Sequence, residues 1–182
     1  MQPVRIAVVV GSTREGRVGD AFARWVAEVA GGRGDCAVDV LDLAEFDFPA
    51  HYPRQPTAEV RRFAERIGRA DGFVVVTPEY NRSFPASLKQ AIDFAYDEWH
   101  AKPAGFVSYG YRSAGLHAVE QLRSVFTELH VMTVRNTVGI DLGDADPMDT
   151  EARRLAAAAM LDQLVWWACA LREARGLRPY VT

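Results

Sequence analysis

Cysteine and net charge are both low in this sequence. The 182 residues include two cysteines, Cys36 and Cys169, which lie far apart and form no CxxC pair. We therefore predict neither a disulfide framework nor a zinc site, and we expect buried free thiols in a reducing cytoplasm. The net charge of -3 gives no reason to expect nucleic acid or an anionic membrane surface as a partner, since both require basic patches.

Long hydrophobic runs are missing as well. The most apolar stretch, residues 155–171, is short for a membrane span and is interrupted by Asp162 and Gln163. We interpret it as part of a helix of a globular protein and expect no membrane partner. The hydrophobic fraction of 49% and charged fraction of 25% are typical of one globular domain, which we predict to cover residues 1–182.

Several catalytic motifs are absent. The residue two positions after Gly11 is threonine, so the GxGxxG fingerprint of dinucleotide-binding proteins is not present. Gly11 and Gly16 have the spacing of a Walker A motif, but Arg17 and Val18 follow, and a valine side chain cannot hold Mg²⁺. No GxSxG, HxxxH or HxE pattern occurs, so we predict neither an α/β-hydrolase nor a metal site.

What the sequence does contain is a regular alternation of apolar runs and helical patterns. The runs at 4–10 and 72–77 are continuous and valine-rich, as expected for strands covered on both faces. Predicted strands cover residues 4–10, 37–43, 72–77, 104–109 and 131–140, the last interrupted at 135–137. Predicted helices cover residues 17–30, 57–69, 86–96, 114–129 and 150–175, the last ended by Gly176.

Five such β–α units predict an α/β fold with a parallel sheet and helices on both faces. We predict a flavodoxin-like three-layer α/β/α sandwich whose five-stranded parallel sheet has the order 2-1-3-4-5. In that order the direction of winding changes between the first and third strands. Ligands bind at this switch point, so the loops that follow these two strands are expected to form one site.

The first of these loops, GSTREGR at residues 11–17, leads into a helix N-terminus. Free backbone N–H groups, the hydroxyls of Ser12 and Thr13, and the guanidinium groups of Arg14 and Arg17 suit a phosphate held without metal. The alternative is a polar turn with solvated arginines.

The second loop, TPEYNRSFP at residues 77–85, suits a flat polar ring. Tyr80 offers an aromatic face, while Glu79 and Asn81 can bond to backbone or to a ring edge. The loop after the fourth strand, SYGYRSAG at residues 108–115, lies on the same edge, and its glycines permit close backbone approach. A phosphate site beside a ring site indicates bound flavin mononucleotide (FMN), which requires no catalytic side chain.

These segments resemble those of the NADPH-dependent FMN reductase family, in the family's order. The resemblance rests on GSTREGRVG, ADGFVVVTPEYNRSFPASLKQAID and SYGYRSAGLHAVEQLR, and covers about residues 4–140. It implies a flavodoxin-like fold, FMN as cofactor, NADPH or NADH as co-substrate, and a homodimer or tetramer. The sequence departs from the family pattern at Phe84, Ala86 and Tyr111, which narrow the space expected over the ring.

The loops and the resemblance together define the predicted site. The cofactor-binding residues are Ser12, Thr13, Arg14, Arg17, Val18, Gly19, Pro78, Glu79, Tyr80, Asn81, Ser108, Tyr109 and Gly110. The predicted function is that of a cytoplasmic FMN-dependent NAD(P)H oxidoreductase. It passes hydride to FMN and then to a flavin, quinone, azo compound or similar acceptor. The alternative is a non-catalytic flavodoxin-like electron carrier or flavin-binding module with the same fold.

Overall fold

A computed structural model describes residues 2–181 and shows five strands alternating with five helices. The elements follow the predicted order because each apolar run is long enough for a strand and each amphipathic stretch for a helix. The strands are β1 (Val4–Val10), β2 (Cys36–Asp42), β3 (Gly72–Pro78), β4 (Pro103–Gly110) and β5 (Met132–Asp141). The helices are α1 (Gly19–Gly31), α2 (Ala58–Arg69), α3 (Ala86–Phe94), α4 (Leu116–Glu128) and α5 (Glu151–Leu177).

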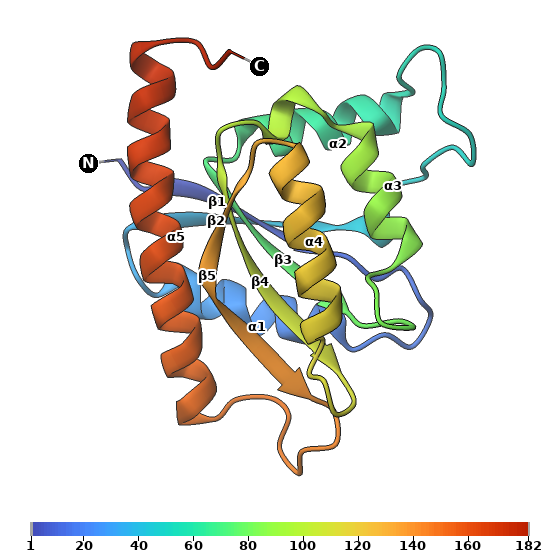
Figure 1. Cartoon of the computed structure of the whole chain (residues 1–182), viewed down its shortest axis with the longest axis vertical. Coiled ribbons are helices and arrows are strands. Elements are labelled where there is room, and N and C mark those ends of the chain that lie inside the picture. Colours follow the sequence, from blue (N-terminus) through green and yellow to red (C-terminus); the bar gives the residue numbers. More distant parts are fainter. Residues whose placement is uncertain (1, 182) are drawn as a thin grey trace.

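All five strands are parallel, in the order β2-β1-β3-β4-β5, which confirms the predicted flavodoxin-like topology. Helices α1 and α5 cover one face of the sheet, and α2, α3 and α4 cover the other (Figure 1). The strands β3 and β4 are buried along their whole length, as their continuous apolar runs predict. Because all five strands are parallel, every strand ends at the same edge of the sheet. The loops that follow β1, β3 and β4 meet there.

The expected interruption in the fifth strand is a β-bulge inside one continuous strand. Ala104 pairs with Thr133, but Phe106 pairs with Thr137, so β5 advances four residues while β4 advances two. The Arg123 side chain of α4 donates hydrogen bonds to the carbonyls of residues 134 and 135, at 2.8 and 3.1 Å. These bonds satisfy polar groups that the bulge removes from the ladder.

Two predicted helix ends differ from the structure. Helix α3 ends at Phe94 rather than residue 96, and a separate 3₁₀ turn follows at Asp97–Trp99. Gly176 does not end the last helix, which continues to Leu177. A glycine ends a helix by adopting positive φ, and Gly176 is not among the glycines that do so. Within residues 2–181 no helix is long and apolar enough to cross a membrane.

Candidate functional site

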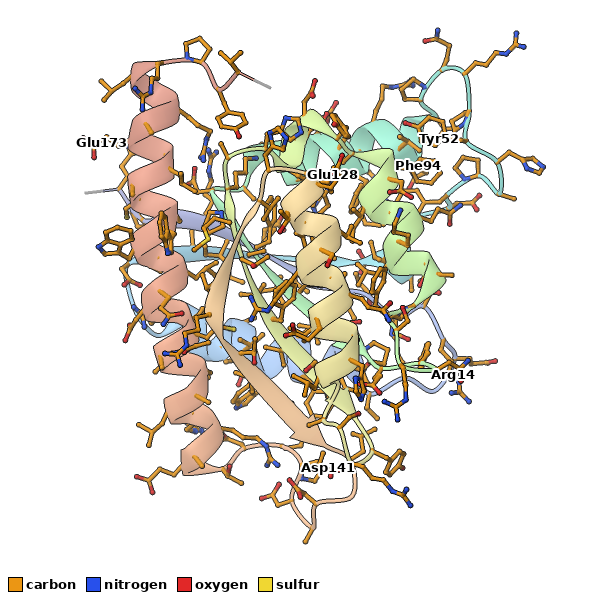
Figure 2. All side chains as sticks on the ribbon, viewed as in Figure 1. Arg14, Tyr52, Phe94, Glu128, Asp141 and Glu173 are labelled. Carbon is orange, nitrogen blue, oxygen red and sulfur yellow. The ribbon has the colours of Figure 1, made fainter. Side chains whose placement is uncertain are left out.

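A cavity of about 430 Å³ lies at the carboxyl edge of the sheet. Loops that are far apart in the sequence form its walls, as the topology predicts. Figure 2 labels Arg14, in the loop after β1, and Asp141, the last residue of β5, at this edge. The lining residues are Arg14, Glu15, Gly16, Arg17, Val18, Pro78, Glu79, Tyr80, Tyr109, Gly110, Tyr111 and Leu142.

The loop between β1 and α1 leaves several backbone donors unused. It begins at Gly11, whose N–H donates to the carbonyl of Val76 at 2.8 Å. Helix α1 then starts without a side-chain cap. Across residues 2–181 no protein acceptor is found for the N–H groups of Val18 and Gly19. A helix start with free N–H groups attracts anions, because these donors add to the positive end of the helix dipole.

Arg17 reaches this cavity with its guanidinium already engaged. One nitrogen donates to the carbonyl of Ser12 at 2.7 Å, and another forms an ion pair with Asp42 at the end of β2. Both side chains of the ion pair are only 17% exposed. Asp42 is therefore part of the surroundings of the site. Sequence reasoning missed it because the only available signal was its place at the end of a strand beside β1.

The loop after β3 turns sharply around Asn81 and Arg82. Both residues have positive φ, 51° and 62°, and the backbones of Tyr80 and Ser83 exchange hydrogen bonds of 2.8 and 2.9 Å. Positive φ at both central residues is the signature of a type I′ turn. The turn presents the Tyr80 hydroxyl to the buried Ser12 hydroxyl, 3.0 Å away. The first and second loops are thereby joined at the cavity.

Two predicted site residues use their side chains for the fold. The Glu79 carboxylate accepts the backbone N–H of His117 at 3.1 Å and so caps the start of α4. The buried Ser108 hydroxyl donates to the carbonyl of Ala114 at 2.8 Å, within the loop that precedes α4. Neither bond points to a ligand, although Glu79 still lines the cavity.

Tyr109 forms the floor between the loops that follow β1 and β3. Its side chain is 4% exposed, and a Cβ added at Gly19 would lie 2.4 Å from its hydroxyl. Glycine at position 19 therefore allows the tyrosine to lie against the start of α1. Burial, followed by the neighbouring Tyr80, raises the pKa of the Tyr109 phenol, which stays neutral at physiological pH.

The structure brings together most of the predicted site. Eight of the predicted residues line the cavity: Arg14, Arg17, Val18, Pro78, Glu79, Tyr80, Tyr109 and Gly110. Five others lie in these loops or in the helix and strand ends beside them without lining it: Ser12, Thr13, Gly19, Asn81 and Ser108. The cavity also includes residues outside the predicted set, namely Glu15, Gly16, Tyr111 and Leu142. Leu142 follows β5, a strand for which no binding loop was predicted.

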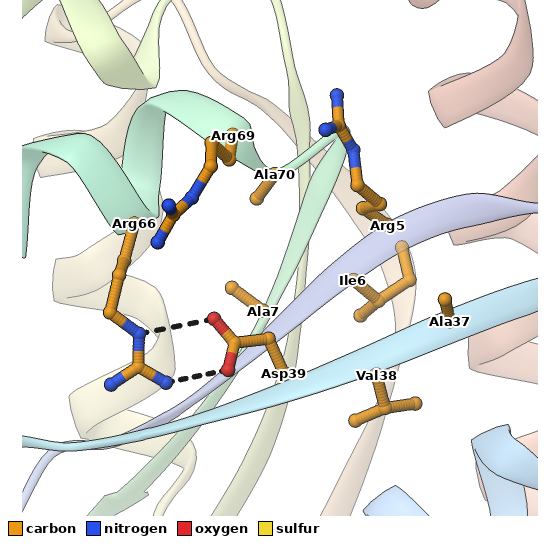
Figure 3. Close-up of a pocket in the computed structure, with 9 residues that line it drawn as sticks. All are labelled: Arg5, Ile6, Ala7, Ala37, Val38, Asp39, Arg66, Arg69 and Ala70. Atoms are coloured by element: carbon orange, nitrogen blue, oxygen red, sulfur yellow. Dashed lines mark hydrogen bonds and ion pairs between the residues drawn. The ribbon is translucent and has the colours of Figure 1, made fainter.

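A smaller cavity of about 240 Å³ lies at the opposite, amino edge of the sheet (Figure 3). It is framed by Arg5, Arg66 and Arg69 over an apolar floor that includes Ile6. Arg66 is bound to Asp39 through two hydrogen bonds of 3.1 and 2.6 Å. Arg66 is thus paired with Asp39 within the protein, whereas the N–H groups at the start of α1, in the larger cavity, have no protein acceptor in the described part of the chain.

Comparison with known proteins identifies the family. The model of the NADPH-dependent FMN reductase family matches residues 4–145, and the chain belongs to this family. An NAD(P)H-dependent FMN reductase of Schizosaccharomyces pombe is 34% identical over 132 residues, which are 66% of this chain and 64% of that protein. The chain thus spans under two thirds of that relative's length. A 2-hydroxy-1,4-benzoquinone reductase of Burkholderia sp is 32% identical over 140 residues, 71% of this chain and 73% of that protein.

Solved structures show the same fold. The flavoenzyme FerB, an NAD(P)H:(acceptor) oxidoreductase from Paracoccus denitrificans, superimposes with a TM-score of 0.75 at 24% identity. The match covers 92% of this chain and 98% of that one. A flavodoxin from Pseudomonas aeruginosa superimposes with a TM-score of 0.57 at 22% identity, covering 92% of this chain and 99% of that one. Both likenesses concern the architecture alone.

Proposed function

We propose that this member of the NADPH-dependent FMN reductase family binds FMN in the carboxyl-edge cavity and catalyses reduction of an acceptor by NAD(P)H. The acceptor is a flavin, a quinone, an azo compound or a similar small molecule. One observation carries the proposal: a helix start with two free N–H groups opens into the same cavity as three tyrosines and the glycine at the end of β4. That arrangement combines an anion site with a site for a flat ring.

The residues present fit FMN at both ends. Arg14 lines the cavity, and no side-chain partner for its guanidinium is found among residues 2–181, so it is available to a phosphate beside the α1 N-terminus. At the other end, Gly110 lies where a Cβ would come within 3.3 Å of the Glu79 side chain. Its bare backbone leaves room for a ligand ring. The volume of about 430 Å³ lies within the usual range of ligand pockets, about 300–1,000 Å³.

When bound, FMN supplies the chemistry of accepting hydride from NAD(P)H and delivering electrons to the second substrate. The residues of the protein bind and orient the cofactor and the substrates. The N–H group of Asn81 has no acceptor among the protein atoms of residues 2–181, and we assign it to the polar edge of the ring. The neutral phenol of Tyr109 gives an uncharged floor, which does not oppose negative charge arriving nearby.

The decisive experiment is a visible absorption spectrum of the purified protein, repeated after anaerobic addition of NADPH. We expect a yellow protein that releases FMN on denaturation and is bleached by NADPH. A protein that is colourless and takes up no added FMN would contradict the proposal. A protein that holds FMN but is reduced by NADPH only at a negligible rate in stopped-flow mixing would be an electron carrier.

We propose that Arg82 or Arg112, which stand on the loops at the cavity mouth, favours NADPH over NADH. Each can meet the 2′-phosphate of NADPH. Arg82 lies 3.0 Å from His117 through its terminal nitrogen, whereas Arg112 has no side-chain partner among residues 2–181. We therefore expect Arg112→Ala to lower the NADPH/NADH ratio of kcat/KM more than Arg82→Ala. An unchanged ratio in both variants would rule out this assignment.

The assembly and the compartment belong to the same proposal. A homodimer or tetramer is supported by large apolar side chains left exposed beside the cavity, among them Val18, Tyr111 and Leu116. Light scattering of the purified chain distinguishes these states from a monomer.

A cytoplasmic location is supported by the two cysteines, which are both free thiols. Cys36 is buried as predicted, whereas Cys169 is only partly buried. Cell fractionation tests the location.

A further inference from the structure

Asp141, the last residue of β5, connects two loops at the mouth of the carboxyl-edge cavity (Figure 2). One oxygen of its carboxylate accepts the backbone N–H of Arg112 at 3.1 Å and that of Gly143 at 2.8 Å. Arg112 belongs to the loop after β4, and Gly143 to the loop after β5. A single carboxylate oxygen therefore holds both loops.

Each of these loops supplies one wall residue of the cavity. Tyr111 precedes Arg112, and Leu142 precedes Gly143, so each wall residue is adjacent to a bond made by Asp141. The Leu142 N–H also donates to the carbonyl of Gly110 at 3.1 Å, which keeps the two loops in register. Tyr111 is 71% exposed and therefore stands at the opening rather than in the interior.

The loop that carries Tyr111 needs an external support. Arg112 and Ala114 have φ values of 67° and 50°, in the left-handed region that non-glycine residues rarely adopt. The far end of this loop is held by the bond from Ser108 to the carbonyl of Ala114. Its near end is held by Asp141. Without that bond the backbone of residue 112 has a less strained alternative, and Tyr111 moves with it.

We propose that Asp141 is a positioning residue that sets the opening between Tyr111 and Leu142. The opening admits the flat aromatic ring of a substrate, the nicotinamide or the quinone, and stacks it against an aromatic and an aliphatic side chain. FMN is held mainly by the first two loops, so its affinity is independent of this clamp. The role in substrate entry rests on the proposed function, whereas the clamp itself does not.

The first test is amide hydrogen exchange on the cofactor-free protein. In Asp141→Ala, the loops at 111–115 and 142–146 lose a shared acceptor, and we expect both to exchange about fivefold faster or more, as for one lost hydrogen bond. Asp141→Asn keeps a carbonyl oxygen and should retain the slow exchange. Asp146→Ala is the matched control, because it removes an acid from the same segment; within residues 2–181 the Asp146 side chain accepts the Met148 N–H alone, at 3.1 Å.

A second variant perturbs the clamp without removing the acid. A Cβ at Gly143 would lie 3.2 Å from the Asp141 oxygen that accepts both bonds. Gly143→Ala should therefore loosen both loops as Asp141→Ala does, and it keeps the proposal testable if the latter fails to fold. Faster exchange confined to 142–146, or in neither loop, would overturn the clamp.

The second test separates substrate entry from cofactor binding. In Asp141→Ala we expect KM for NADPH and for a benzoquinone to rise about fivefold, while the Kd for FMN stays within about twofold of the wild type. An unchanged KM, or a Kd for FMN that weakens in parallel with KM, would overturn the role assigned to Asp141. If the wild type binds no FMN at all, the proposed function fails, and the exchange experiment still decides whether the clamp exists.

Discussion

The two edges of the sheet use their polar groups in opposite ways. At the amino edge, Asp71 is buried beside the side chains of Arg172 and Arg175, at 3.4 and 3.5 Å. Lys102 is also buried there, and its ammonium donates to two carbonyls at the end of α2, both at 2.9 Å. Asp71 and Lys102 thus find their partners within the protein, in contacts that join helices to the sheet.

At the carboxyl edge, donors remain unused. The N–H groups at the start of α1 and the guanidinium of Arg14 have no protein acceptor within residues 2–181. Burying polar groups is costly unless they are paired, so such donors persist where solvent or a ligand meets them. The comparison indicates that one edge stabilises the fold and the other is reserved for binding. Substitutions at the two edges should therefore affect different measurements.

The largest effect on stability is expected for Asp71→Ala. Asp71 accepts the Arg5 N–H at 2.9 Å and pairs with three arginines, which would then face one another without an acid. Breaking a buried ion pair typically costs about 3–5 kcal/mol, and because these arginines are partly exposed we expect about 3 kcal/mol. Urea unfolding measures the loss, and Asp71→Asn should lose less because it keeps an acceptor. A weakened affinity for FMN in the folded variant would contradict the division between the edges.

Lys102 gives the amino edge a pH dependence. Burial lowers its pKa from 10.5 to about 8, so the native state binds fewer protons than the unfolded chain between these values. The lysine therefore destabilises the fold below pH 8, and this penalty disappears as the pH rises toward 10.5. We expect the free energy of unfolding of the wild type to rise relative to Lys102→Met by on the order of 2–3 kcal/mol across this window.

The comparison of the wild type with Lys102→Met is needed because Cys36 titrates in a pH range that overlaps that of Lys102. Burial raises its pKa to about 11, so its own contribution to stability falls as the pH rises above 9. This contribution is common to both proteins and cancels in the difference. A difference that does not change between pH 8 and 10.5 would show that the buried ammonium is not destabilising.

The sequence predicts the fold well because burial and chain direction determine it locally. Continuous apolar runs define β1 and β3 to within a residue, and the helix predicted to begin at Thr57 is α2, which Thr57 caps by accepting the N–H of Val60. The bulge in β5 was not predictable, because Arg123 and Gln163, which satisfy its backbone, come from other elements.

The site is predictable to the level of its loops but not of its side-chain directions. The switch point brings the loops together, which is why eight predicted residues line one cavity. The direction of the Glu79 and Ser108 side chains depends on the position of α4 and its preceding loop. The role of Asp42 depends on Arg17, 25 residues earlier in the chain. Such pairings come from tertiary packing, which the sequence pattern alone does not specify.

At the carboxyl edge, Arg14→Ala should weaken binding rather than stability. We expect the Kd for FMN to rise about tenfold, because one charge-assisted contact to the phosphate is lost at an exposed position. Riboflavin, which lacks the phosphate, should bind the variant and the wild type equally. Fluorescence titration measures both ligands, and Arg69→Ala, at the amino-edge cavity, is the matched control. A parallel loss of riboflavin affinity would place Arg14 at the ring instead.

The smallest effect on stability is expected for Asp39→Asn at the amino-edge cavity (Figure 3). The Asp39 side chain is 52% exposed, and exposed ion pairs contribute little, so the loss of its pairing with Arg66 should cost less than about 1 kcal/mol. FMN affinity should not change. If the variant instead loses FMN affinity while its unfolding is unaltered, the cavities at the two edges are coupled. The assignment of one edge to stability and the other to binding would then be wrong.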